Sequence, residues 1–307
     1  MKYLIVGTGG TGGCIGGFLA KSGKDVSFIA RGSHLEAIRE NGLQLISSRI
    51  GNFTLKNVKA YAMEEYEGSP DVVFVCVKYY SIDETCDFLS RVVRKDTLVI
   101  PVLNVFGTGR VMQERLNCPV MDGCIYIYSM ITAPGEVSQP TKIFKVYYGY
   151  RKGQIHSAKE VARKVHSDLT EAGIDAYFTQ EIEKEALTKF SFVSPMGAAG
   201  LYYNAVGGDF KAEGVKRDTF IALVNEVKNL AEAMGIALTK DIVEKNLKIM
   251  DAMTDDSTTS MQRDVERHRD SEIDGLVHRV VRLAKEYGAQ VPIYEKISMW
   301  AKQKGIK

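Results

Sequence analysis

The sequence predicts an α/β fold class in which an N-terminal domain built on a doubly wound parallel sheet precedes an all-α helical domain. Short apolar runs alternate with helical patterns in the first half, a glycine-rich motif follows the first run, and strand patterns cease after about Thr179. Such alternation is typical of a parallel sheet covered by helices on both faces. We therefore expect two domains in the 307 residues, at 1–179 and 180–307.

The strands and helices of the first domain follow from local patterns. Strands are expected at 2–6, 26–30, 72–77, 97–103 and 174–178, and helices at 12–22, 33–42, 80–93 and 158–171. The continuously apolar run VVFVCV at 72–77 is typical of a parallel strand buried on both faces. Ser33 and Glu36 have the spacing of a capping box, which places a helix start at Ser33. Segments rich in Tyr, Ile and Val between Pro119 and Tyr150 are interpreted as strands, partly antiparallel, that extend the sheet.

The second domain shows helical periodicity almost throughout. Its clearest apolar stripe consists of Phe220, Leu223, Val227, Leu230 and Met234. Gly235 follows this stripe as a stop signal. The segments 239–253 and 261–287 repeat the helical pattern, and residues 255–259 between them lack it and are expected to form a loop. We interpret the stripes as the core of a helical bundle.

The composition argues against several classes of function. Lys and Arg total 40 against 38 Asp and Glu, so the near-neutral chain favours neither nucleic acid nor an anionic membrane as a partner. No apolar run reaches the ~18 residues of a membrane span, and the first run is shorter than that of a signal peptide. The five cysteines lack CxxC spacing and the five histidines form no HExxH pair. We therefore expect free thiols in a reducing cytoplasm and no metal site.

A glycine-rich motif stands directly after the first strand, where the first helix begins. Its residues Gly7, Thr8, Gly9, Gly10, Thr11 and Gly12 fit the pattern GxGxxG. In this context glycines allow a tight turn, a close approach of backbone to pyrophosphate and close packing of helix on strand, and the helix N-terminus attracts phosphate. The motif predicts a Rossmann-like dinucleotide site, with a plain glycine-rich turn as the alternative. Gly13, Gly16 and Gly17 indicate a close neighbour for the same helix.

The end of the second strand predicts which dinucleotide binds. A site for NAD places Asp or Glu about 20 residues after the motif, where the carboxylate accepts a hydrogen bond from the ribose 2′-hydroxyl. This chain has Arg31 at that place. A guanidinium can bind a 2′-phosphate through two hydrogen bonds, whereas a carboxylate would repel it. Arg31 therefore favours NADP, and the alternative is an arginine merely exposed at a strand end.

Two further polar residues follow buried strands of the predicted sheet. Lys78 follows VVFVCV, and Asn104 follows VIPVL. Because ligands of doubly wound sheets bind at the carboxyl ends of the strands, both are candidates for cofactor contacts. Position alone leaves open that either is a solvated strand terminus.

With these residues in view, the chain resembles the ketopantoate reductase (2-dehydropantoate 2-reductase) family over nearly its whole length. The family's cofactor-binding pattern is matched by GTGGTG at 7–12, Arg31, Lys78, and Asn104 before FGTG. Its catalytic-lysine segment and C-terminal signature are matched by EALTK ending at Lys189, SMQRD at 260–264, Arg269, EID at 272–274 and Pro292. The C-terminal signature is specific because it combines order, spacing and residue type.

The resemblance implies that NADPH reduces the ketone of a 2-oxo acid, with conversion of 2-dehydropantoate to (R)-pantoate in pantothenate biosynthesis as the leading candidate. It implies that Lys189 is the general acid and also holds substrate oxygens. It further implies that Glu272 orients the hydroxyl and contacts the nicotinamide ribose. Ser260 is implied to bind the substrate carboxylate, and Asn104 to position nicotinamide and substrate. An ammonium near the carbonyl oxygen stabilises developing alkoxide charge and then donates a proton.

Three of these residues also have simpler explanations. Lys189 could lie on the solvated face of an amphipathic helix. Glu272 could pair with Arg269, three residues earlier on a helix. Ser260 could be the N-cap of a helix that starts at Met261.

The chain departs from the family where the family places asparagines that hold the substrate. Val193 and Gly197 stand four and eight residues after Lys189, and Gly207 replaces a third asparagine. The residues expected to line this part of the pocket are Val193, Met196, Gly197 and Ala198. We expect a roomier and more apolar pocket, suited to a bulkier or more apolar ketone or 2-oxo acid.

Two other functions stay open at this point. One is an NADP-dependent opine or 3-hydroxy acid type dehydrogenase, which would share the GxGxxG motif but not the SMQRD segment. The other is a non-catalytic NADP-binding regulator, favoured by the missing asparagines and disfavoured by Lys189 and Glu272. Pairing of two copies into a homodimer is compatible with the sequence, and no residue decides it.

Overall fold

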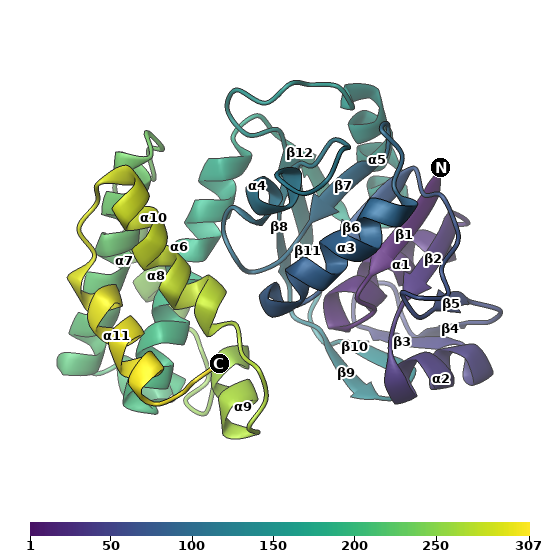
Figure 1. Ribbon diagram of the computed structural model, residues 1–307. Helices are drawn as coiled ribbons and strands as arrows, with labels where there is room; N and C mark the ends of the chain where they lie inside the picture. Colours follow the sequence, from purple (N-terminus) through teal and green to yellow (C-terminus); the bar gives the residue numbers. More distant parts are fainter. The chain divides into compact units, whose positions relative to one another are not determined.

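The computed structural model describes residues 1 to 307 and divides into two compact units (Figure 1). The sheet unit comprises residues 1–103 and 107–182, and the helical unit comprises residues 104–106 and 183–307. The segment 104–106 therefore interrupts the sheet unit in the sequence, but it belongs to the helical unit by its contacts. The domain boundary expected after Thr179 stays a prediction.

A five-stranded parallel sheet forms the centre of the sheet unit, in the order β5-β2-β1-β6-β7. Its strands are β1 (Lys2–Val6), β2 (Asp25–Ile29), β5 (Lys59–Tyr61), β6 (Val72–Val75) and β7 (Leu98–Pro101). The helical segments of the unit are α1 (Gly10–Lys21), α2 (Gly32–Asn41), η1 (Tyr79–Ser81), α3 (Ile82–Val92), α4 (Thr108–Gln113) and α5 (Lys159–Glu171). The predicted parallel sheet is confirmed.

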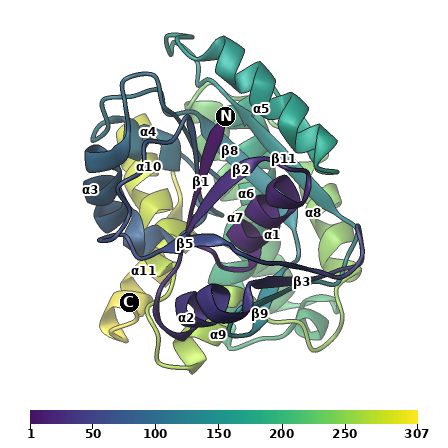
Figure 2. The same ribbon diagram turned by 90° about the vertical axis from the view of Figure 1, so that its right-hand side faces the viewer.

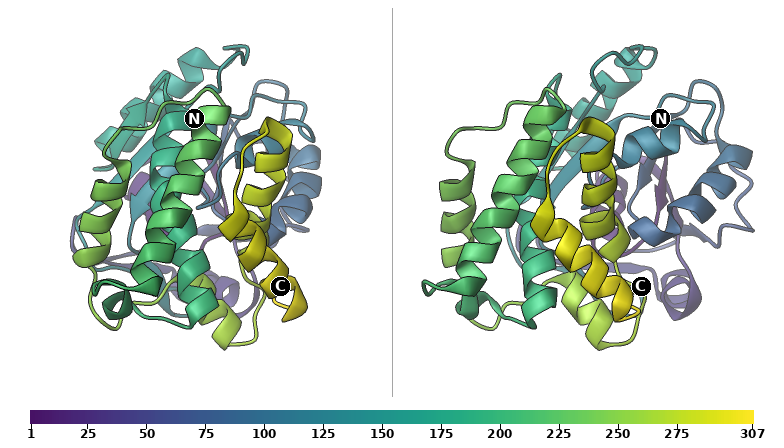
Figure 3. Two further views of the ribbon diagram at one scale, coloured as in Figure 1. Left: turned by 90° about the vertical axis from the view of Figure 1, so that its left-hand side faces the viewer. Right: turned by 60° about the vertical axis from the view of Figure 1, so that its left-hand side comes forward.

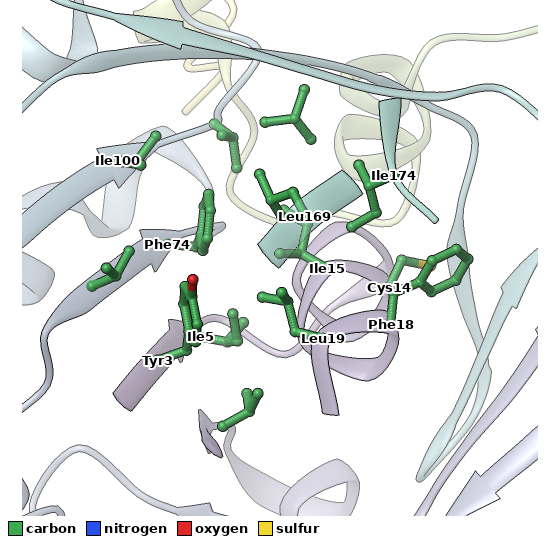
Figure 4. Packing of buried hydrophobic residues seen from close by; sticks show 14 of the residues in the cluster. Tyr3, Ile5, Cys14, Ile15, Phe18, Leu19, Phe74, Ile100, Leu169 and Ile174 are labelled. Atoms are coloured by element: carbon green, nitrogen blue, oxygen red, sulfur yellow. The ribbon is translucent and has the colours of Figure 1, made fainter. Parts of the chain in front are cut away.

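Both faces of this sheet are buried. Tyr3 and Ile5 of β1 join one apolar cluster with Phe18 of α1, and Figure 4 shows their side chains among those of α1 and α5. Leu4, which alternates with them along the strand, joins a second cluster with Leu89 of α3. Because successive strand residues point to opposite faces, helices cover the sheet on both sides, as in a doubly wound fold.

Helix α1 lies between two sheets, which explains its many glycines (Figures 1 and 2). It packs on β1 and β2 on one side and on β3 (Leu43–Ser47) and β10 (Glu136–Gln139) on the other. A Cβ at Gly16 would lie 2.3 Å from the Phe28 ring, and one at Gly17 would lie 2.8 Å from Leu45. The close neighbour indicated by these glycines is therefore a sheet on each side.

The strands after residue 119 form separate sheets, so the expectation that they extend the parallel sheet is wrong. One sheet has the order β4-β3-β10-β9 and the other β12-β11-β8. Their remaining strands are β4 (Phe53–Leu55), β8 (Asp122–Ile127), β9 (Met130–Ala133), β11 (Phe144–Gly149) and β12 (Asp175–Phe178). Val99 of β7 forms one isolated bridge with Val120. Two residues later in β7, Pro101 has no N–H to donate, so the pairing with the chain at Val120 does not continue beyond this bridge.

The start of α2 also differs from the expected capping box at Ser33. The helix begins at Gly32, its N-cap residue is Arg31, and no side chain caps it. Gly32 adopts φ +56°, a conformation that glycine enters without strain. The chain therefore turns into the helix one residue earlier, and Ser33 lies inside the first turn.

The helical unit contains no strand, as expected from the pattern after residue 179 (Figure 3). Its helices are α6 (Ile182–Tyr203), α7 (Val215–Ala233), α8 (Ile242–Asp251), α9 (Ser260–Glu266), α10 (Arg279–Tyr287) and α11 (Pro292–Gln303). A 3₁₀ turn, η2 (Gly207–Phe210), and a π-helix, η3 (Asp274–His278), complete it. Phe220, Leu223 and Val227 of the predicted α7 stripe are fully buried, and Gly235 follows the helix with φ +73°.

The segment 261–287 is not one helix, and this expectation is corrected. Helix α9 ends at Glu266, and the polar residues that follow carry no apolar stripe. His268 adopts φ +53°, which a helix cannot accommodate. Helical structure resumes only with the π-helix η3.

No helix in the structure has both the length and the hydropathy that a membrane crossing would need. The five cysteines are free, and four of them are buried. No group of three or more His, Cys, Asp or Glu side chains is arranged to hold a metal ion.

Candidate active site

The glycine-rich loop connects β1 to the first turn of α1 at the carboxyl edge of the five-stranded sheet. The N–H groups of Gly7 and Thr8 donate to the Ile29 carbonyl oxygen at 3.2 and 3.0 Å, and the Thr8 hydroxyl donates to it at 2.9 Å. Thr8 is 3% exposed, so its side chain fastens the loop to the end of β2. Gly7 has φ +92°, and a Cβ there would lie 3.0 Å from the Cys76 carbonyl carbon. This turn therefore requires glycine.

The start of α1 has the features of a phosphate-binding site. Gly9 is its N-cap, no side chain caps the helix, and the first turn carries no acidic residue. A Cβ at Gly9 would meet nothing within 4 Å, whereas at Gly10 it would lie 2.6 Å from the Ser129 carbonyl oxygen. At Gly12 it would lie only 2.1 Å from the Gly7 carbonyl oxygen. The open space at Gly9, unpaired first-turn N–H groups and the helix dipole fit a dinucleotide pyrophosphate.

The sheet unit places the other predicted cofactor residues at the same edge. Arg31 lies just after β2 and is exposed, with extended backbone at φ −145° and ψ 159°. Lys78 lies just after β6 and is half-buried. Thr11 is half-buried in the first turn of α1. Since β2 and β6 are the two neighbours of β1, a basic residue follows the strand on each side of the glycine-rich loop.

In the helical unit, two predicted residues from distant parts of the chain meet directly. The Lys189 Nζ donates a hydrogen bond to Asn104 Oδ1 at 2.6 Å, across 85 positions of sequence. Lys189 lies on α6, and both side chains are half-buried. The ammonium is therefore held by a side-chain partner, which argues against a role as a freely solvated helix residue.

The segment 104–106 is anchored beside Lys189 by its last residue. The Phe106 ring lies 6.3 Å from that of Phe190, the residue after Lys189. The Phe106 carbonyl accepts a hydrogen bond from Arg279 Nε at 2.9 Å. Phe106 is 5% exposed, so apolar burial fixes the backbone that presents Asn104.

Glu272 stands at the start of the helical segment that follows the α9 break. It is 3% exposed, and its carbonyl accepts the Leu276 N–H at 2.8 Å. Arg269 is exposed in the connection after α9. The two residues therefore do not share a helix, and the proposed pairing three residues apart on one helix is wrong.

Ser260 is the first residue of α9 and not its cap. Thr259 is the N-cap, and its hydroxyl accepts the Gln262 N–H at 3.2 Å. The Gln262 side chain in turn accepts the Thr259 N–H at 2.9 Å, which completes a capping box. The sequence signal T-x-x-Q was present at 259–262 and would have identified this cap.

Two of the positions where the family places asparagines have close neighbours in the structure. A Cβ at Gly197 would lie 3.2 Å from the terminal methyl of Met261, and one at Gly207 would lie 2.6 Å from the Thr254 carbonyl oxygen. Met196 and Ala198 are 2% and 0% exposed. Met261 and the Thr254 backbone therefore lie next to these glycines, and the expectation of a roomier and more apolar pocket stays a prediction.

Residues that the sequence reasoning missed hold α6 together. Pro195 lies inside the helix, and a proline at that place leaves one carbonyl without its usual partner. Asn246 of α8 donates to the Ser191 carbonyl at 2.9 Å. Ser194 donates to the Leu276 carbonyl of the π-helix at 2.5 Å. The proline was a visible signal that a buried donor must lie nearby.

Comparison with known proteins settles the family. The family described as Ketopantoate reductase PanE/ApbA matches residues 3–153, and Ketopantoate reductase PanE/ApbA C terminal matches residues 181–305. The chain belongs to the ketopantoate reductase family. Membership makes it an oxidoreductase of the 2-dehydropantoate 2-reductase type and confirms the resemblance seen in the sequence.

Relatives match this family member from end to end. "Uncharacterized oxidoreductase YkpB" of Bacillus subtilis (strain 168) is 26% identical over 302 residues, covering 97% of this chain and 96% of its own. "2-dehydropantoate 2-reductase" of Pyrococcus horikoshii is 26% identical, covering 98% and 96%.

Solved structures share the fold over nearly the whole chain. A 2-dehydropantoate 2-reductase from Geobacter metallireducens has a TM-score of 0.89 at 24% identity, covering 99% of this chain and 100% of its own. A D-mandelate dehydrogenase in a ternary structure with NADH and anilino(oxo)acetate has a TM-score of 0.87 at 22% identity, covering 99% and 98%. The predicted order of a Rossmann-like domain followed by a helical domain is thereby confirmed.

Proposed function

We propose that this ketopantoate reductase family member uses NADPH to reduce the ketone of a 2-oxo acid to the corresponding 2-hydroxy acid. The first substrate to test is 2-dehydropantoate, whose product (R)-pantoate would place the enzyme in pantothenate biosynthesis in the cytoplasm. The 2.6 Å hydrogen bond between Lys189 and Asn104 carries the proposal. It supports a fixed ammonium in a chain whose Pyrococcus horikoshii relative is named 2-dehydropantoate 2-reductase.

The residues of the sheet unit fit NADPH. The first-turn N–H groups of α1, beside the open position at Gly9, would bind the pyrophosphate. Arg31 would bind the 2′-phosphate, and Lys78 would add a second positive charge at the same edge. When bound, NADPH supplies the hydride that adds to the ketone carbon.

The residues of the helical unit would supply the proton and hold the acid. Negative charge develops on the ketone oxygen as its carbon gains the hydride, and the Lys189 ammonium stabilises that charge and then donates a proton. One Lys189 N–H on Asn104 orients the others, because an ammonium carries three donors in fixed directions. Glu272 would accept a hydrogen bond from the new hydroxyl, and Ser260 would donate one to the substrate carboxylate.

NADPH oxidation with 2-dehydropantoate, beside a panel of other 2-oxo acids, tests the proposal. We expect turnover with 2-dehydropantoate that exceeds turnover with the other acids. Turnover confined to another 2-oxo acid would assign the enzyme to that acid. NADPH binding without turnover on any acid would favour the regulator and reject the reductase.

A second candidate substrate class follows from one observation. Two apolar side chains lie at α6 near Lys189. Val193 is on the helix itself, four residues after the lysine, and Met261 packs against the helix at Gly197. An apolar surface leaves a substrate hydroxyl without a partner, at a cost of about 1–3 kcal/mol. A 2-oxo acid with an apolar side chain is therefore the alternative, and a ratio of kcat/KM that favours it over 2-dehydropantoate would select it.

A further inference from the structure

Helix α6 contains a break in its hydrogen bonding close to Lys189. Pro195 lies inside this 22-residue helix and has no N–H to donate to the carbonyl four residues earlier. That carbonyl belongs to Ser191, which is fully buried. A buried carbonyl without a partner is strongly unfavourable, so another donor is required.

Asn246 of α8 supplies that donor. Its Nδ2 lies 2.9 Å from the Ser191 carbonyl oxygen and 2.9 Å from Ser191 Oγ. Asn246 is 2% exposed, so no water is needed to complete the contact. Both hydrogen bonds of this amide nitrogen are thus made to one residue of α6.

The same contact leads along the chain to Lys189. Ser191 Oγ donates to the Thr188 carbonyl at 2.7 Å, and Thr188 directly precedes Lys189. The Lys189 ammonium is held at its far end by Asn104 at 2.6 Å. Asn246 therefore fixes the backbone of the lysine, while Asn104 fixes its tip.

We propose that Asn246 is a positioning residue for Lys189, which replaces the helical hydrogen bond removed by Pro195 and so sets where the ammonium is presented. The inference rests on the proposed function, because it assigns Asn246 a part in the reaction that Lys189 performs. Displacements of about 1 Å at a remote residue can lower a rate ~10²-fold. Loss of Asn246 should therefore reduce kcat without reducing NADPH affinity.

The primary test is Asn246→Leu, which keeps the side-chain size and removes both donors. We expect kcat to fall about 10- to 100-fold, the alkaline limb of the kcat–pH profile to shift, and the Kd for NADPH to stay within about twofold. Glu226→Gln is the matched control, because Glu226 is a buried side chain that caps α11 through the N–H groups of Ile293 and Tyr294. This control should lose stability and keep its pH profile. A folded Asn246→Leu with wild-type kcat and pH profile would reject the proposal.

Pro195→Ala tests whether Asn246 acts by replacing the helical hydrogen bond that the proline removes. Alanine restores the N–H that can donate to the Ser191 carbonyl, so Asn246 becomes less necessary. Pro195→Ala alone should keep kcat near that of the wild type. In the double variant Asn246→Leu/Pro195→Ala, log kcat should return at least halfway from the value of Asn246→Leu to the wild-type value. If Asn246→Leu does not fold, Asn246→Ser, which is too short to reach both oxygens, takes its place in the cycle. Absence of rescue would overturn the assignment.

A second readout separates this proposal from the proposed function. Trace acetylation of the protein with acetic anhydride at several pH values, followed by mass spectrometry, reports the reactivity of Lys189 against that of the exposed Lys248. We expect Asn246→Leu to raise the relative reactivity of Lys189 and Pro195→Ala to reverse the change. If the wild type reduces no 2-oxo acid, the proposed function fails and this labelling still decides the positioning. Unchanged labelling would reject it.

Discussion

The sheet unit collects its proposed pyrophosphate-binding residues within six consecutive positions, 7–12, whereas the helical unit collects its proposed reaction residues from positions 104, 189, 260 and 272. In the sheet unit the loop is held by hydrogen bonds to Ile29 at the end of the neighbouring strand. In the helical unit the pair of Lys189 and Asn104 depends on a contact across 85 positions. One site is a local motif on a regular sheet, and the other is an assembly of separate segments.

The two units also differ in how regular their elements are. The glycines of α1 allow a regular helix to fit tightly between two sheets. The helical unit instead contains Pro195 inside α6 and a π-helix at Asp274–His278. Buried side chains bond to the backbone at both places: Asn246 donates to the Ser191 carbonyl, and Ser194 donates to the Leu276 carbonyl. A local motif tolerates change elsewhere, whereas the assembled site should respond to substitutions that touch no ligand.

The largest expected effect is that of Lys189→Ala. Loss of the general acid should lower kcat by about 10²- to 10⁴-fold, while the Kd for NADPH stays within about twofold because the proposed phosphate contacts, at residues 7–12, Arg31 and Lys78, lie in the sheet unit. Lys248→Ala, an exposed lysine of the same unit, is the control and should change neither quantity. Steady-state kinetics and NADPH titration measure both, and retention of a tenth of kcat would contradict the role.

A pair of glycine substitutions tests how local the phosphate site is. In Gly12→Ala the new Cβ would lie 2.1 Å from the Gly7 carbonyl oxygen, so we expect about 3 kcal/mol less stability and loss of NADPH binding. In Gly9→Ala the Cβ meets no protein atom within 4 Å. We therefore expect unchanged stability and NADPH affinity lower by about tenfold or more, since only the pyrophosphate is obstructed. Urea unfolding and NADPH titration separate the two effects, and equal affinity in Gly9→Ala would argue against the site.

Arg31→Ala tests the preference for NADPH. Charge-assisted hydrogen bonds contribute about 1.5–3 kcal/mol, so kcat/KM with NADPH should fall roughly 10- to 100-fold. The value with NADH should stay within about threefold, because NADH has no 2′-phosphate, and it serves as the internal control. A parallel fall with both cofactors would show that Arg31 acts on the structure of the loop instead.

The smallest expected effects concern how the stability of each unit changes as the pH falls. Burial raises the pKa of the Asp168 carboxyl, but hydrogen bonds from Lys24 and Tyr3 outweigh it and leave the pKa below the ordinary 3.8. Burial raises the pKa of Glu226 above the ordinary 4.5, although two backbone N–H groups oppose it. The Asp168 contribution to stability is thus present above pH 3.8 and is lost as pH falls through the folded pKa. The Glu226 carboxyl instead stabilises the helical unit as pH falls toward 4.5.

Hydrogen exchange in β1 and α7 between pH 7 and 3 measures this difference. Asp168→Asn should cost the sheet unit on the order of 1–2 kcal/mol at pH 7, and this cost should shrink as the pH falls below 3.8. Glu226→Gln should remove the gain that the wild-type helical unit shows on mild acidification. We expect acid to destabilise the sheet unit and to stabilise the helical unit. A fall of hydrogen-exchange protection in both units over the same pH range would contradict this expectation.

Much of the fold could be predicted because local patterns determine it. Residues 72–75 of the run at 72–77 form β6 and are fully buried, and the stripe from Phe220 lies on the buried face of α7. Where prediction failed, one residue with an unusual backbone requirement decided the outcome. Pro101 ended the ladder toward Val120, Gly32 began α2 early, and His268 ended the helical run after α9.

The candidate site divides in the same way. The glycine-rich motif, Arg31 and Lys78 could be placed at one sheet edge because parallel strands end on the same side. The surroundings of Gly197 and Gly207 could not be predicted, because the atoms nearest to these glycines include ones from residues 253–261. No spacing rule links those positions, and only their packing shows which atoms lie there.

The sequence by itself determined the two-part fold, the phosphate-binding motif and the basic residue types at its edge, since periodicity, glycine geometry and charge act over a few residues. Only the tertiary structure decided that Lys189 meets Asn104, that Asn246 completes the helix broken by Pro195, and that Met261 fills the place beside Gly197. These contacts join residues far apart in the chain, and each depends on how buried polar groups find partners and how side chains fill space when helices pack.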